Sequence, residues 1–513
     1  MLSRVYCAST IGVDARLIEV EVNMSGGVPK YFLVGLPDRA VSESKDRIDA
    51  ALKNAGARFP RGRITVNLAP ADLPKEGSAF DLPIAVSLLA VSEQIVTDKL
   101  EQSLILGELA LDGQLRPVKG VLPMAVEARN RGLEYVLVPK DNGNEAAVVD
   151  GISVMAFENL HQVMRWLENE RTMQPIQIDP HSLFSTNGQA EALDFEDVRG
   201  QETVKRALEV AASGGHNVIM VGPPGSGKTM MARRIPTILP PLTLNEALET
   251  TKIHSVAGLM EAGRSLVTHR PFRSPHHTVS DVALVGGGSI PMPGEISMAH
   301  NGVLFLDELP EFKRSALEVM RQPLEDGFVS ISRARMSVCY PSRIMLVASM
   351  NPSPTGDWHD PDESNGAANI QMQRYLGKIS GPLLDRIDLH VEVDKVSFDE
   401  LSAKTKGESS ASIRSRVIEA REIQARRFMG MEGVYCNAQM STKMARKICK
   451  IDEAGEAMMK KAMNSLGLSA RAFDRILKVS RTVADLDRSE AIQSHHIAEA
   501  IQYRNLDREG WLG

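Results

Sequence analysis

A glycine-rich segment ahead of a lysine and a threonine is the strongest chemical signal in the sequence. The segment NVIMVGPPGSGKTMMARRI (217–235) contains an apolar run and then the spacing Gly-x-x-x-x-Gly-Lys-Thr. Glycines let backbone N–H groups turn toward phosphate oxygens, and a helix that starts there adds the positive end of its dipole. The pattern predicts that Lys228 contacts the β- and γ-phosphates of ATP and that Thr229 binds Mg²⁺. The predicted loop residues are Gly222, Pro223, Pro224, Gly225, Ser226, Gly227, Lys228 and Thr229.

A pair of carboxylates follows a second apolar run. The segment GVLFLDELPEF (302–312) places Asp307 and Glu308 directly after the apolar residues 303–306. In open α/β sheets, ligands bind beyond the carboxyl ends of the strands. This position suits Asp307 to hold the metal ion and Glu308 to polarise the attacking water.

A third apolar run ends in an amide. The segment IMLVASMNPSP (344–354) ends its apolar part at Asn351, whose side chain can orient water beside the γ-phosphate. A turn-forming asparagine before Pro352 is the plainer alternative.

Two arginines are candidates for stabilising charge on a transferring phosphoryl group. The segment ISGPLLDRIDLH (379–390) places Arg386 in a short turn that we expect to be exposed, and Arg471 lies at the start of a predicted helix over 468–486. An arginine supplied across a subunit boundary can perform this role. From chemistry alone, each could equally be a surface salt-bridge residue.

A serine and a lysine near the N-terminal third raise the question of a protease. The segment LPKEGSAFDLPIAV (73–86) places Lys75 and Ser78 just ahead of an apolar run, roughly as a serine–lysine protease presents its nucleophile. Such a dyad needs the two side chains within hydrogen-bond reach. The sequence context of the two residues therefore has to decide between a protease and a protease-like scaffold.

The elements that would position these residues fall into an α/β multidomain plan. At about 100–200 residues per domain, 513 residues suggest about three domains. Short β-rich runs and helical runs alternate first, with predicted strands over 31–37 and 62–70, a helix over 39–56, and a hairpin, helix and strand over 107–139. The predicted parts are an α+β domain (1–168), a polar linker (169–190), an α/β nucleotide-binding core (191–395) and a helical C-terminal domain (396–513).

Composition excludes several classes of protein. No apolar run approaches the about 20 residues that a membrane helix needs, and the start lacks a signal-peptide pattern. The four cysteines are far apart, without a CxxC pair, which fits a reducing cytoplasm and argues against a disulfide framework. A nucleic-acid-binding protein with a net charge of −6 would need a local basic surface. We therefore expect a cytoplasmic protein with no membrane partner.

The motifs in this order resemble the AAA+ ATPases. The segment 271–312 is similar to the magnesium-chelatase-like branch, and VGLPDRAVSESKDRI together with RITVNLAPADLPKEGSAFDLP resembles the ComM (YifB-type) family of that branch over essentially the whole chain. The resemblance implies ATP and Mg²⁺ as cofactors, Asn351 as sensor 1, Arg386 as the arginine finger and Arg471 as the sensor 2 arginine. It also implies a homohexameric ring that drives branch migration of single-stranded and branched DNA during natural transformation and recombination.

Two insertions of this branch are candidate DNA-contact hairpins. One lies within 255–292, and the other spans 325–343, where Arg333 and Arg335 alternate and so share one face of a strand. A third basic segment in the N-terminal domain, ARFPRGRI (57–64), contains Arg58, Arg61 and Arg63. An ordinary solvated surface is the alternative for each segment. Because many relatives carry cysteines after the sensor 1 asparagine and 351–369 has none, with only His359 among a few acids, we predict no zinc.

The N-terminal domain resembles the Lon protease domain, a fold also found in the RadA recombination protein. On that resemblance, the position of the nucleophile falls on Ala79, one residue after Ser78, and the position of the lysine falls on Leu122, three residues after Lys119. Both positions are apolar, so we predict an inactive protease domain in which Ser78 is a turn or cap hydroxyl. By resemblance to RadA, the domain could instead scaffold the ring and contact DNA.

The leading hypothesis is thus an ATP-dependent DNA motor. A metal-chelatase motor subunit, an ATP-dependent protease and a protein remodeller remain the alternatives. Hydrolysis that rises with single-stranded or forked DNA would favour the motor over the chelatase subunit and the remodeller, and an absence of casein degradation would dismiss the protease.

Overall fold

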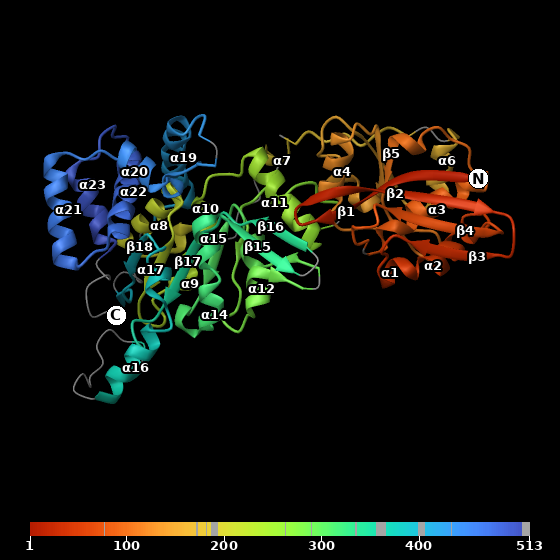
Figure 1. Ribbon diagram of the computed structural model, residues 1–513. Helices are drawn as coiled ribbons and strands as arrows, with labels where there is room; N and C mark the ends of the chain where they lie inside the picture. The colour runs from red at the N-terminus through yellow and green to blue at the C-terminus, as the bar shows by residue number, and fades with distance from the viewer. Residues whose placement is uncertain are drawn as a thin grey trace.

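The molecule is elongated, with its three parts in a row (Figure 1). The N-terminal domain lies at one end, the C-terminal helices lie at the other, and the central sheet lies between them. The computed structural model describes residues 1–504 except 76, 171–172, 181, 186–192, 262, 289, 334–335, 355, 357–365, 399–405 and 432. Within those residues, no helix combines the length and the apolar character that crossing a membrane requires.

Seven strands form the sheet of the N-terminal domain. A long antiparallel hairpin is at its centre, and the later strands add in parallel on one side. In sheet order the strands are β3 (Lys30–Val34), β4 (Arg63–Ala69), β2 (Asp14–Ser25), β1 (Leu2–Ile11), β5 (Ser103–Ile105), β8 (Tyr135–Pro139) and β9 (Ser153–Phe157). The predicted strands over 31–37 and 62–70 are confirmed as β3 and β4.

Helices cover one face of this sheet. The side chains of β1 and β2 alternate between the two faces of the sheet. Helices α3 and α4 pack on the face where these side chains are buried. The helices are α1 (Arg39–Ser42), α2 (Ser44–Asn54), α3 (Asp81–Val91), α4 (Val121–Asn130), α5 (Gly143–Ala146) and α6 (Leu160–Leu167), and a small hairpin joins β6 (Glu108–Leu109) to β7 (Leu115–Arg116). The predicted hairpin, helix and strand over 107–139 are therefore confirmed.

The single helix predicted over 39–56 is wrong, because the structure has two helices there. Glu43 ends α1 and precedes α2. The Ser42 hydroxyl and the Ser42 N–H both donate to the carbonyl of Asp38, at 2.7 and 3.0 Å, so the first helix keeps its own hydrogen bonds up to the break. The sequence period runs through this break because both helices present the same apolar face.

Part of the predicted linker is packed rather than free. Ile176 N donates to Val154 O at 3.0 Å, so the chain follows the edge of β9. A β-carbon on Gly143 would lie 2.6 Å from Ile176 Cδ1, which shows how closely the two segments approach. A short helix, α7 (Ser182–Ser185), follows.

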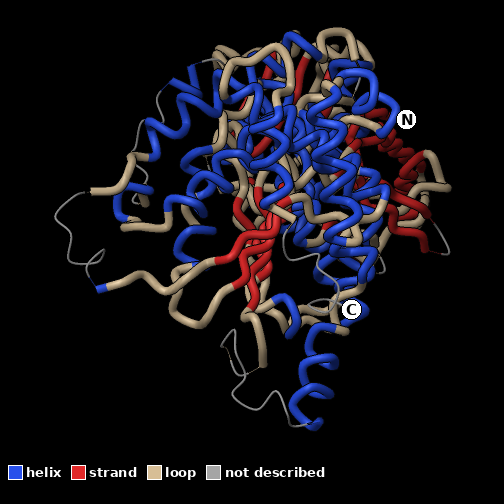
Figure 2. Tube along the Cα trace, turned by 90° about the vertical axis from the view of Figure 1, so that its left-hand side faces the viewer, coloured by secondary structure: helices blue, strands red, loops and turns tan. Residues whose placement is uncertain are grey.

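Five parallel strands form the central sheet, so all their carboxyl ends lie at one edge. In sheet order they are β11 (Phe272–Arg273), β14 (Val303–Leu306), β17 (Met345–Met350), β10 (Val218–Val221) and β18 (Leu389–Glu392). The helices of this part are α8 (Glu202–Gly214), α9 (Lys228–Ala232), α10 (Ile235–Ile238), α11 (Leu244–Ala257), α12 (Asp281–Val285), α13 (Glu295–Met298), α14 (Arg314–Glu318), α15 (Arg321–Asp326), α16 (Gly366–Leu376) and α17 (Gly381–Leu384). Helix α16 projects away from the rest in two views (Figures 1 and 2).

Two short antiparallel hairpins interrupt this plan. One joins β12 (Gly286–Gly287) to β13 (Met292–Pro293), and the other joins β15 (Phe328–Arg333) to β16 (Met336–Pro341). Tyr340 Oη donates to Pro291 O at 2.7 Å and so connects them. The hairpins predicted within 255–292 and 325–343 therefore exist and contact each other, although the first extends past residue 292.

The C-terminal helices share one core with the central sheet. The helices are α19 (Ser410–Arg427), α20 (Thr442–Ile448), α21 (Glu453–Leu466), α22 (Ala470–Leu486) and α23 (Ser494–Gln502). Buried side chains of α22, such as Ile476 and Val483, belong to the same cluster as those of β10 and α8. Figure 2 views the molecule from this end and shows helices around the strands of the central part.

The N-terminal domain contacts the central part at the turn between β1 and β2 and around α4 and α11. At the turn between β1 and β2, a β-carbon on Gly12 would lie 2.8 Å from Val338 Cγ1 of β16. Elsewhere α11 packs on α4, where Gly120 N donates to Ser255 O at 3.1 Å and the Ser255 hydroxyl donates to the buried carboxyl of Glu145. Burial raises the pKa of Glu145, although the hydrogen bond from the Ser255 hydroxyl opposes the rise.

Candidate functional site

The predicted phosphate-binding loop connects β10 to α9. Gly222 must be a glycine because a β-carbon there would lie 2.1 Å from Val393 O. Gly227 has a φ of 91°, a left-handed conformation that favours glycine, and it directly precedes α9. The hydroxyl of Ser226 is buried and has no hydrogen-bond partner among the residues that the structure describes. A loop with a buried, unsatisfied donor fits a ligand rich in acceptor oxygens.

Lys228 points back over this loop. Its Nζ donates to Gly222 O at 2.6 Å, to Pro223 O at 2.9 Å and to Asn351 Oδ1 at 3.3 Å. Only 8% of the residue is exposed. Burial lowers the pKa of Lys228, while the carboxylates of Asp307 and Glu308 act in the opposite direction. A buried ammonium held only by neutral oxygens is suited to an anionic ligand.

The carboxylate of Asp307, which directly follows β14, accepts three hydrogen bonds. The Thr229 hydroxyl donates to its Oδ2 at 2.7 Å, the Ser349 hydroxyl donates to its Oδ1, and the N–H of Glu308 donates to Oδ1 at 3.2 Å. A carboxylate beside a hydroxyl is a donor set that Mg²⁺ accepts, usually with water and substrate phosphates completing its shell. These residues therefore fit a magnesium–nucleotide complex.

Glu308 and Asn351 flank this group. Glu308 has a φ of 54° and a side chain that is 59% exposed, and its Oε2 lies 3.8 Å from His277 Nδ1. The carbonyl of Asn351 accepts from Tyr375 Oη at 3.2 Å. Sequence reasoning missed His277, Ser349 and Tyr375. Of these, Ser349 carries a signal, because it lies near the carboxyl end of β17, two residues before Asn351.

Arg386 and Arg471 lie at the other edge of the sheet. The turn that carries Arg386 precedes β18, whose first residue pairs with the first residue of β10, whereas the phosphate-binding loop follows the last residue of β10. The two arginines line one cleft with Glu325, Arg343 and Asp385. Arg471 donates to Asp385 Oδ2 at 3.3 Å and keeps 66% of its side chain exposed.

The turn that carries Arg386 was expected to be exposed, and its Gly381 is, but the side chain of Arg386 is mostly covered. Its side chain is only 12% exposed, because NH1 donates to Pro382 O at 2.6 Å and NH2 pairs with Glu325. Asn217 Nδ2 donates to the carbonyl of Arg386 at 2.9 Å, which fixes the backbone of the turn. The sequence could not show these contacts, since each joins segments that are distant along the chain or folds the side chain back on its own turn.

A buried polar network anchors the same turn to the C-terminal helices. Asp388 pairs with His216 Nδ1 at 3.1 Å and with Arg475, and His216 Nε2 lies 2.8 Å from the Thr482 hydroxyl. Burial would raise the pKa of Asp388, but the charge of Arg475 and the hydrogen bond with His216 outweigh it and hold that pKa below its usual value. Helix α22 therefore supplies both Arg475 to this network and Arg471 to the cleft.

The N-terminal domain contains no assembled serine–lysine pair among the candidates. Ala79 and Leu122, the two positions of the dyad, are both buried. Ser78 donates to Glu108, and the buried ammonium of Lys75 donates to Pro70 O. Lys119 lies against Gly258 of the central part, where a β-carbon would be 2.5 Å from its Cε. The three polar candidates thus have three separate sets of neighbours.

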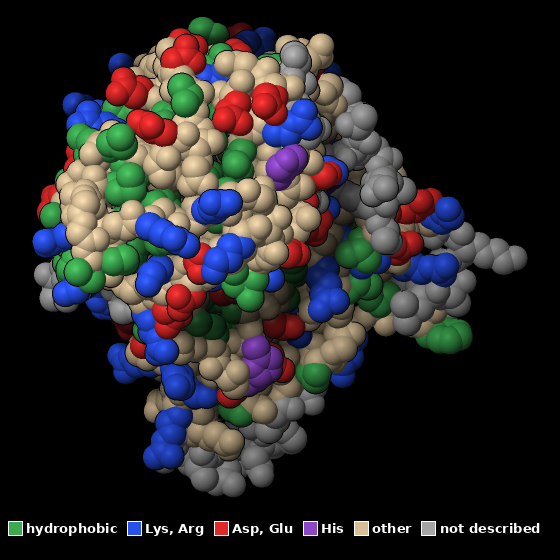
Figure 3. Space-filling view, turned by 90° about the vertical axis from the view of Figure 1, so that its right-hand side faces the viewer, with side chains coloured by type: hydrophobic (Ala, Val, Ile, Leu, Met, Phe, Trp, Pro, Cys, Tyr) green, Lys and Arg blue, Asp and Glu red, His purple; other side chains and the backbone are tan. Residues whose placement is uncertain are grey.

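The candidate DNA-contact arginines lie on separate surfaces. Arg333 is exposed near the tip of its hairpin and donates to Gly288 O at 3.3 Å, whereas Arg335 lies outside the described residues. Arg58 and Arg61 line one shallow hollow, and Arg63 instead stacks on Phe32 with 5.4 Å between the guanidinium and the ring centre. Figure 3 views the end formed by the N-terminal domain and shows lysines and arginines gathered across its middle and lower part, beside hydrophobic side chains.

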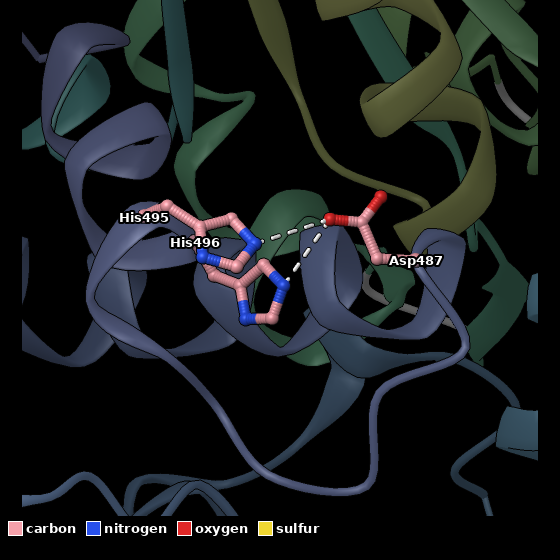
Figure 4. A group of neighbouring side chains, drawn as sticks. All are labelled: Asp487, His495 and His496. Atoms are coloured by element: carbon pink, nitrogen blue, oxygen red, sulfur yellow. Dashed lines mark ion pairs between the residues drawn. The ribbon is translucent and has the colours of Figure 1, made fainter.

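One group in the described ranges has the composition of a metal site. Asp487, His495 and His496 converge near the start of α23 (Figure 4), and His496 Nε2 lies 3.2 Å from Asp487 Oδ2. His496 Nδ1 accepts the N–H of Gln493 at 2.9 Å and so caps the helix. A neutral ring that accepts at Nδ1 keeps its proton on Nε2, which leaves no lone pair for a metal there. We interpret the group as a helix cap in which the protonated Nε2 of the neutral His496 ring faces the Asp487 carboxylate. The residue His359, considered above for zinc, lies outside the described residues.

The sheet order, the phosphate-binding loop, the acidic strand end and the following asparagine define a P-loop protein of the AAA+ class. The family described as magnesium chelatase, subunit ChlI, matches residues 194–401, and two further ChlI descriptions match 20–142 and 407–504. The chain is 45% identical over 509 residues to competence protein ComM of Haemophilus influenzae, which covers 99% of this chain and 98% of that protein.

Identity to YifB of Escherichia coli is likewise 45%, over 510 residues and with the same shares of both chains. The chain belongs to the ComM/YifB family of magnesium-chelatase-like AAA+ proteins. A shorter match, at 34% identity over 157 residues, joins the N-terminal part to Lon protease 2 of Bacillus subtilis and covers 28% of this chain and 27% of that one. The Lon-like character expected for this domain agrees with this similarity, whereas its inactivity as a protease stays a prediction.

Proposed function

We propose that the protein is an ATP-dependent DNA motor that acts as a homohexameric ring. Its task would be to drive branch migration when incoming DNA is integrated by homologous recombination, as in natural transformation. A relative that shares nearly the full length is named a competence protein, which supports this assignment.

One observation carries the proposal: the residues for ATP hydrolysis are divided between two edges of the central sheet. Lys228, Thr229 and Asp307 lie at the carboxyl edge, and Arg386 and Arg471 lie beside the opposite edge. A single chain cannot bring these two groups together without rearranging its core. Head-to-tail contact between copies can, and a head-to-tail contact that closes gives a ring.

Each residue at the carboxyl edge has a chemical task that its neighbours support. Lys228 is held where its charge can neutralise phosphate oxygens, and Thr229 with Asp307 would hold Mg²⁺. The metal ion would supply charge stabilisation to the transferring phosphoryl group. Glu308 is exposed and can accept a proton from water, and the Asn351 amide lies beside Lys228, where it can orient that water.

Across the subunit boundary, Arg386 would act as the arginine finger and Arg471 as sensor 2. Both face the same cleft, so one neighbouring nucleotide could meet both. The fixed backbone of the turn and the long helix α22 provide rigid support for them.

DNA contact would come from the two hairpins. Their tips meet where Arg333 donates to Gly288. The side chains along β15 alternate between an exposed face and a face buried in the core. A protein of net charge −6 needs such local basic positions to bind phosphates. Arg58, Arg61 and Arg63 offer a second contact region on the N-terminal domain, divided between two faces.

Branch migration by the purified protein tests the proposal. Synthetic three-strand and four-way junctions are incubated with the protein and ATP, and strand products are separated on native gels. The wild type should move the junction and hydrolyse ATP faster with forked DNA. The isosteric Glu308→Gln variant, which keeps the binding residues, should do neither. Hydrolysis that ignores DNA would refute the motor and favour the remodeller.

A further inference from the structure

Arg386 is retained within its own chain by contacts from two segments. Its NH1 donates to Pro382 O at 2.6 Å, its NH2 pairs with Glu325, and only 12% of the side chain is exposed. Its Nε is buried and makes no hydrogen bond within the part of the chain that the structure describes. A guanidinium in this position cannot reach a neighbouring subunit until the pair with Glu325 is broken.

Glu325 lies at the root of the hairpin β15–β16. It is the fifth of the six residues of α15, Gly327 ends that helix with a φ of 72°, and Phe328 begins the paired strand. Gly327 N donates to Pro323 O at 3.0 Å, and Gly327 O accepts from Ser342 N at 2.8 Å, so the root is hydrogen-bonded on both sides. No flexible spacer separates Glu325 from the hairpin, and a displacement of the hairpin reaches its carboxylate directly.

The rest of the turn that carries Arg386 is anchored elsewhere. Asn217 holds the carbonyl of Arg386, and Asp388 is fixed by His216 and Arg475 in the buried network. Asp385 pairs with Arg471 of α22. The backbone of the turn therefore belongs to the core and to α22, and only the end of the guanidinium is tied to the hairpin.

The Arg386–Glu325 contact has the properties of a reversible latch. The Glu325 side chain is 63% exposed, so the pair is screened by water and is weak enough to break during a working cycle. The hydrogen bond and charge of Arg386 lower the pKa of Glu325, with smaller contributions from Arg471 and Arg321. Glu325 is thus ionised at neutral pH and attracts Arg386 and Arg471.

We propose that Glu325 is a positioning residue that couples the hairpin to the arginine finger: it withholds Arg386 from the neighbouring subunit until DNA displaces the hairpin root. This coupling rests on the proposed function, since it needs both a DNA-contacting hairpin and an arginine that acts across the subunit boundary. It explains how hydrolysis would be kept slow in a ring that has no DNA.

The test compares ATP hydrolysis by the full-length wild type, Glu325→Gln and Asp326→Asn, without DNA and with saturating forked DNA. Glu325→Gln should raise the rate without DNA about two- to fivefold, the factor that corresponds to one exposed ion pair. The rate with saturating DNA should stay unchanged, so the stimulation ratio falls by the same factor. Asp326→Asn removes the same charge one residue further along the root and should keep the wild-type ratio.

Two results would overturn the coupling. A ratio for Glu325→Gln equal to that of the wild type would show that the pair withholds nothing. If Glu325→Gln hydrolyses ATP more slowly than the wild type by the same factor without DNA and with DNA, Glu325 only supports the fold. If the wild type itself hydrolyses ATP without any response to DNA, the proposed function fails and the coupling fails with it, whereas a DNA-stimulated wild type with an unaltered variant removes the coupling alone.

Discussion

Replacing Asp388 with alanine should loosen the contact between the central sheet and the C-terminal helices. The Asp388 side chain is 6% exposed and pairs with His216 and Arg475, whose own side chains are 0% and 21% exposed. Removing one partner of a buried ion pair costs about 3–5 kcal/mol. Because Arg475 can still reach water and His216 keeps its contact with Thr482, we expect the lower end, about 3 kcal/mol.

Hydrogen exchange can measure this loss in α22. At about 1.4 kcal/mol for each factor of ten, 3 kcal/mol corresponds to roughly 100-fold faster exchange of amides that open with the helix. Asp385→Ala is the matched control, because it breaks a pair in the same turn with the 66% exposed Arg471 and should cost at most about 1 kcal/mol. Fluorescence of Trp166, which is buried in the N-terminal domain, should be the same in all three proteins.

The contribution of Asp388 to the stability of the folded protein should decrease at low pH. The pKa of Asp388 is lower in the folded protein than the about 3.9 of an unfolded chain, so its contribution is complete above that value. As pH falls below about 4, toward the folded pKa, the contribution is lost. The difference in thermal midpoint between wild type and Asp388→Ala should thus be constant from pH 8 to about 5 and narrow below about pH 4. Exchange in α22 that is no faster than in Asp385→Ala would refute this reasoning.

Four further substitutions test the site. Lys228→Ala should abolish binding of a fluorescent ATP analogue, since the buried Lys228 ammonium lies against the loop carbonyls of Gly222 and Pro223, and retained tight binding would refute the loop assignment. Glu308→Gln should bind ATP but release phosphate at least about 100-fold more slowly; near-normal turnover would remove Glu308 from the mechanism. Arg386→Ala should be inactive alone and recover activity when mixed with Lys228→Ala chains, and no recovery at any ratio contradicts a role in trans. Ser78→Ala and the wild type should both leave casein intact; ATP-dependent cleavage that only the wild type shows would reinstate the protease.

The parts of the site that could be predicted from the sequence depend on local order along the chain. Lys228 and Thr229 start a helix after the buried strand β10, and Asp307 directly follows the buried strand β14. Hydrophobic period and residue spacing therefore place all three residues. The pair of Thr229 and Asp307, which we expect to bind Mg²⁺, followed from that placement, and the two side chains are in hydrogen-bond contact. The hairpin around Arg333 could be predicted for the same reason, because its two paired strands are adjacent along the chain.

The contacts that the sequence did not reveal join distant segments. His216 and Asp388 are separated by 172 residues, and Glu325 and Arg386 by 61. No periodic pattern encodes such pairs, because they arise when helices and turns pack on a sheet. For the same reason the sequence did not show that the side chain of Arg386, in a turn expected to be exposed, is folded back on Glu325.

The contact at Gly12 has a consequence for any shortened form of the protein. Ile11 and Val13 pack against the apolar cluster that contains Val338 and Tyr340 of the hairpin strand, and Leu248 of α11 packs against the core of the N-terminal domain. A chain that lacks residues 1–168 would expose these apolar groups to water and leave one side of the hairpin without support. A defect in such a truncated chain would therefore report damage to the remaining part as much as the loss of the first domain. Single substitutions on the surface of the N-terminal domain, away from Gly12 and α11, separate those two effects.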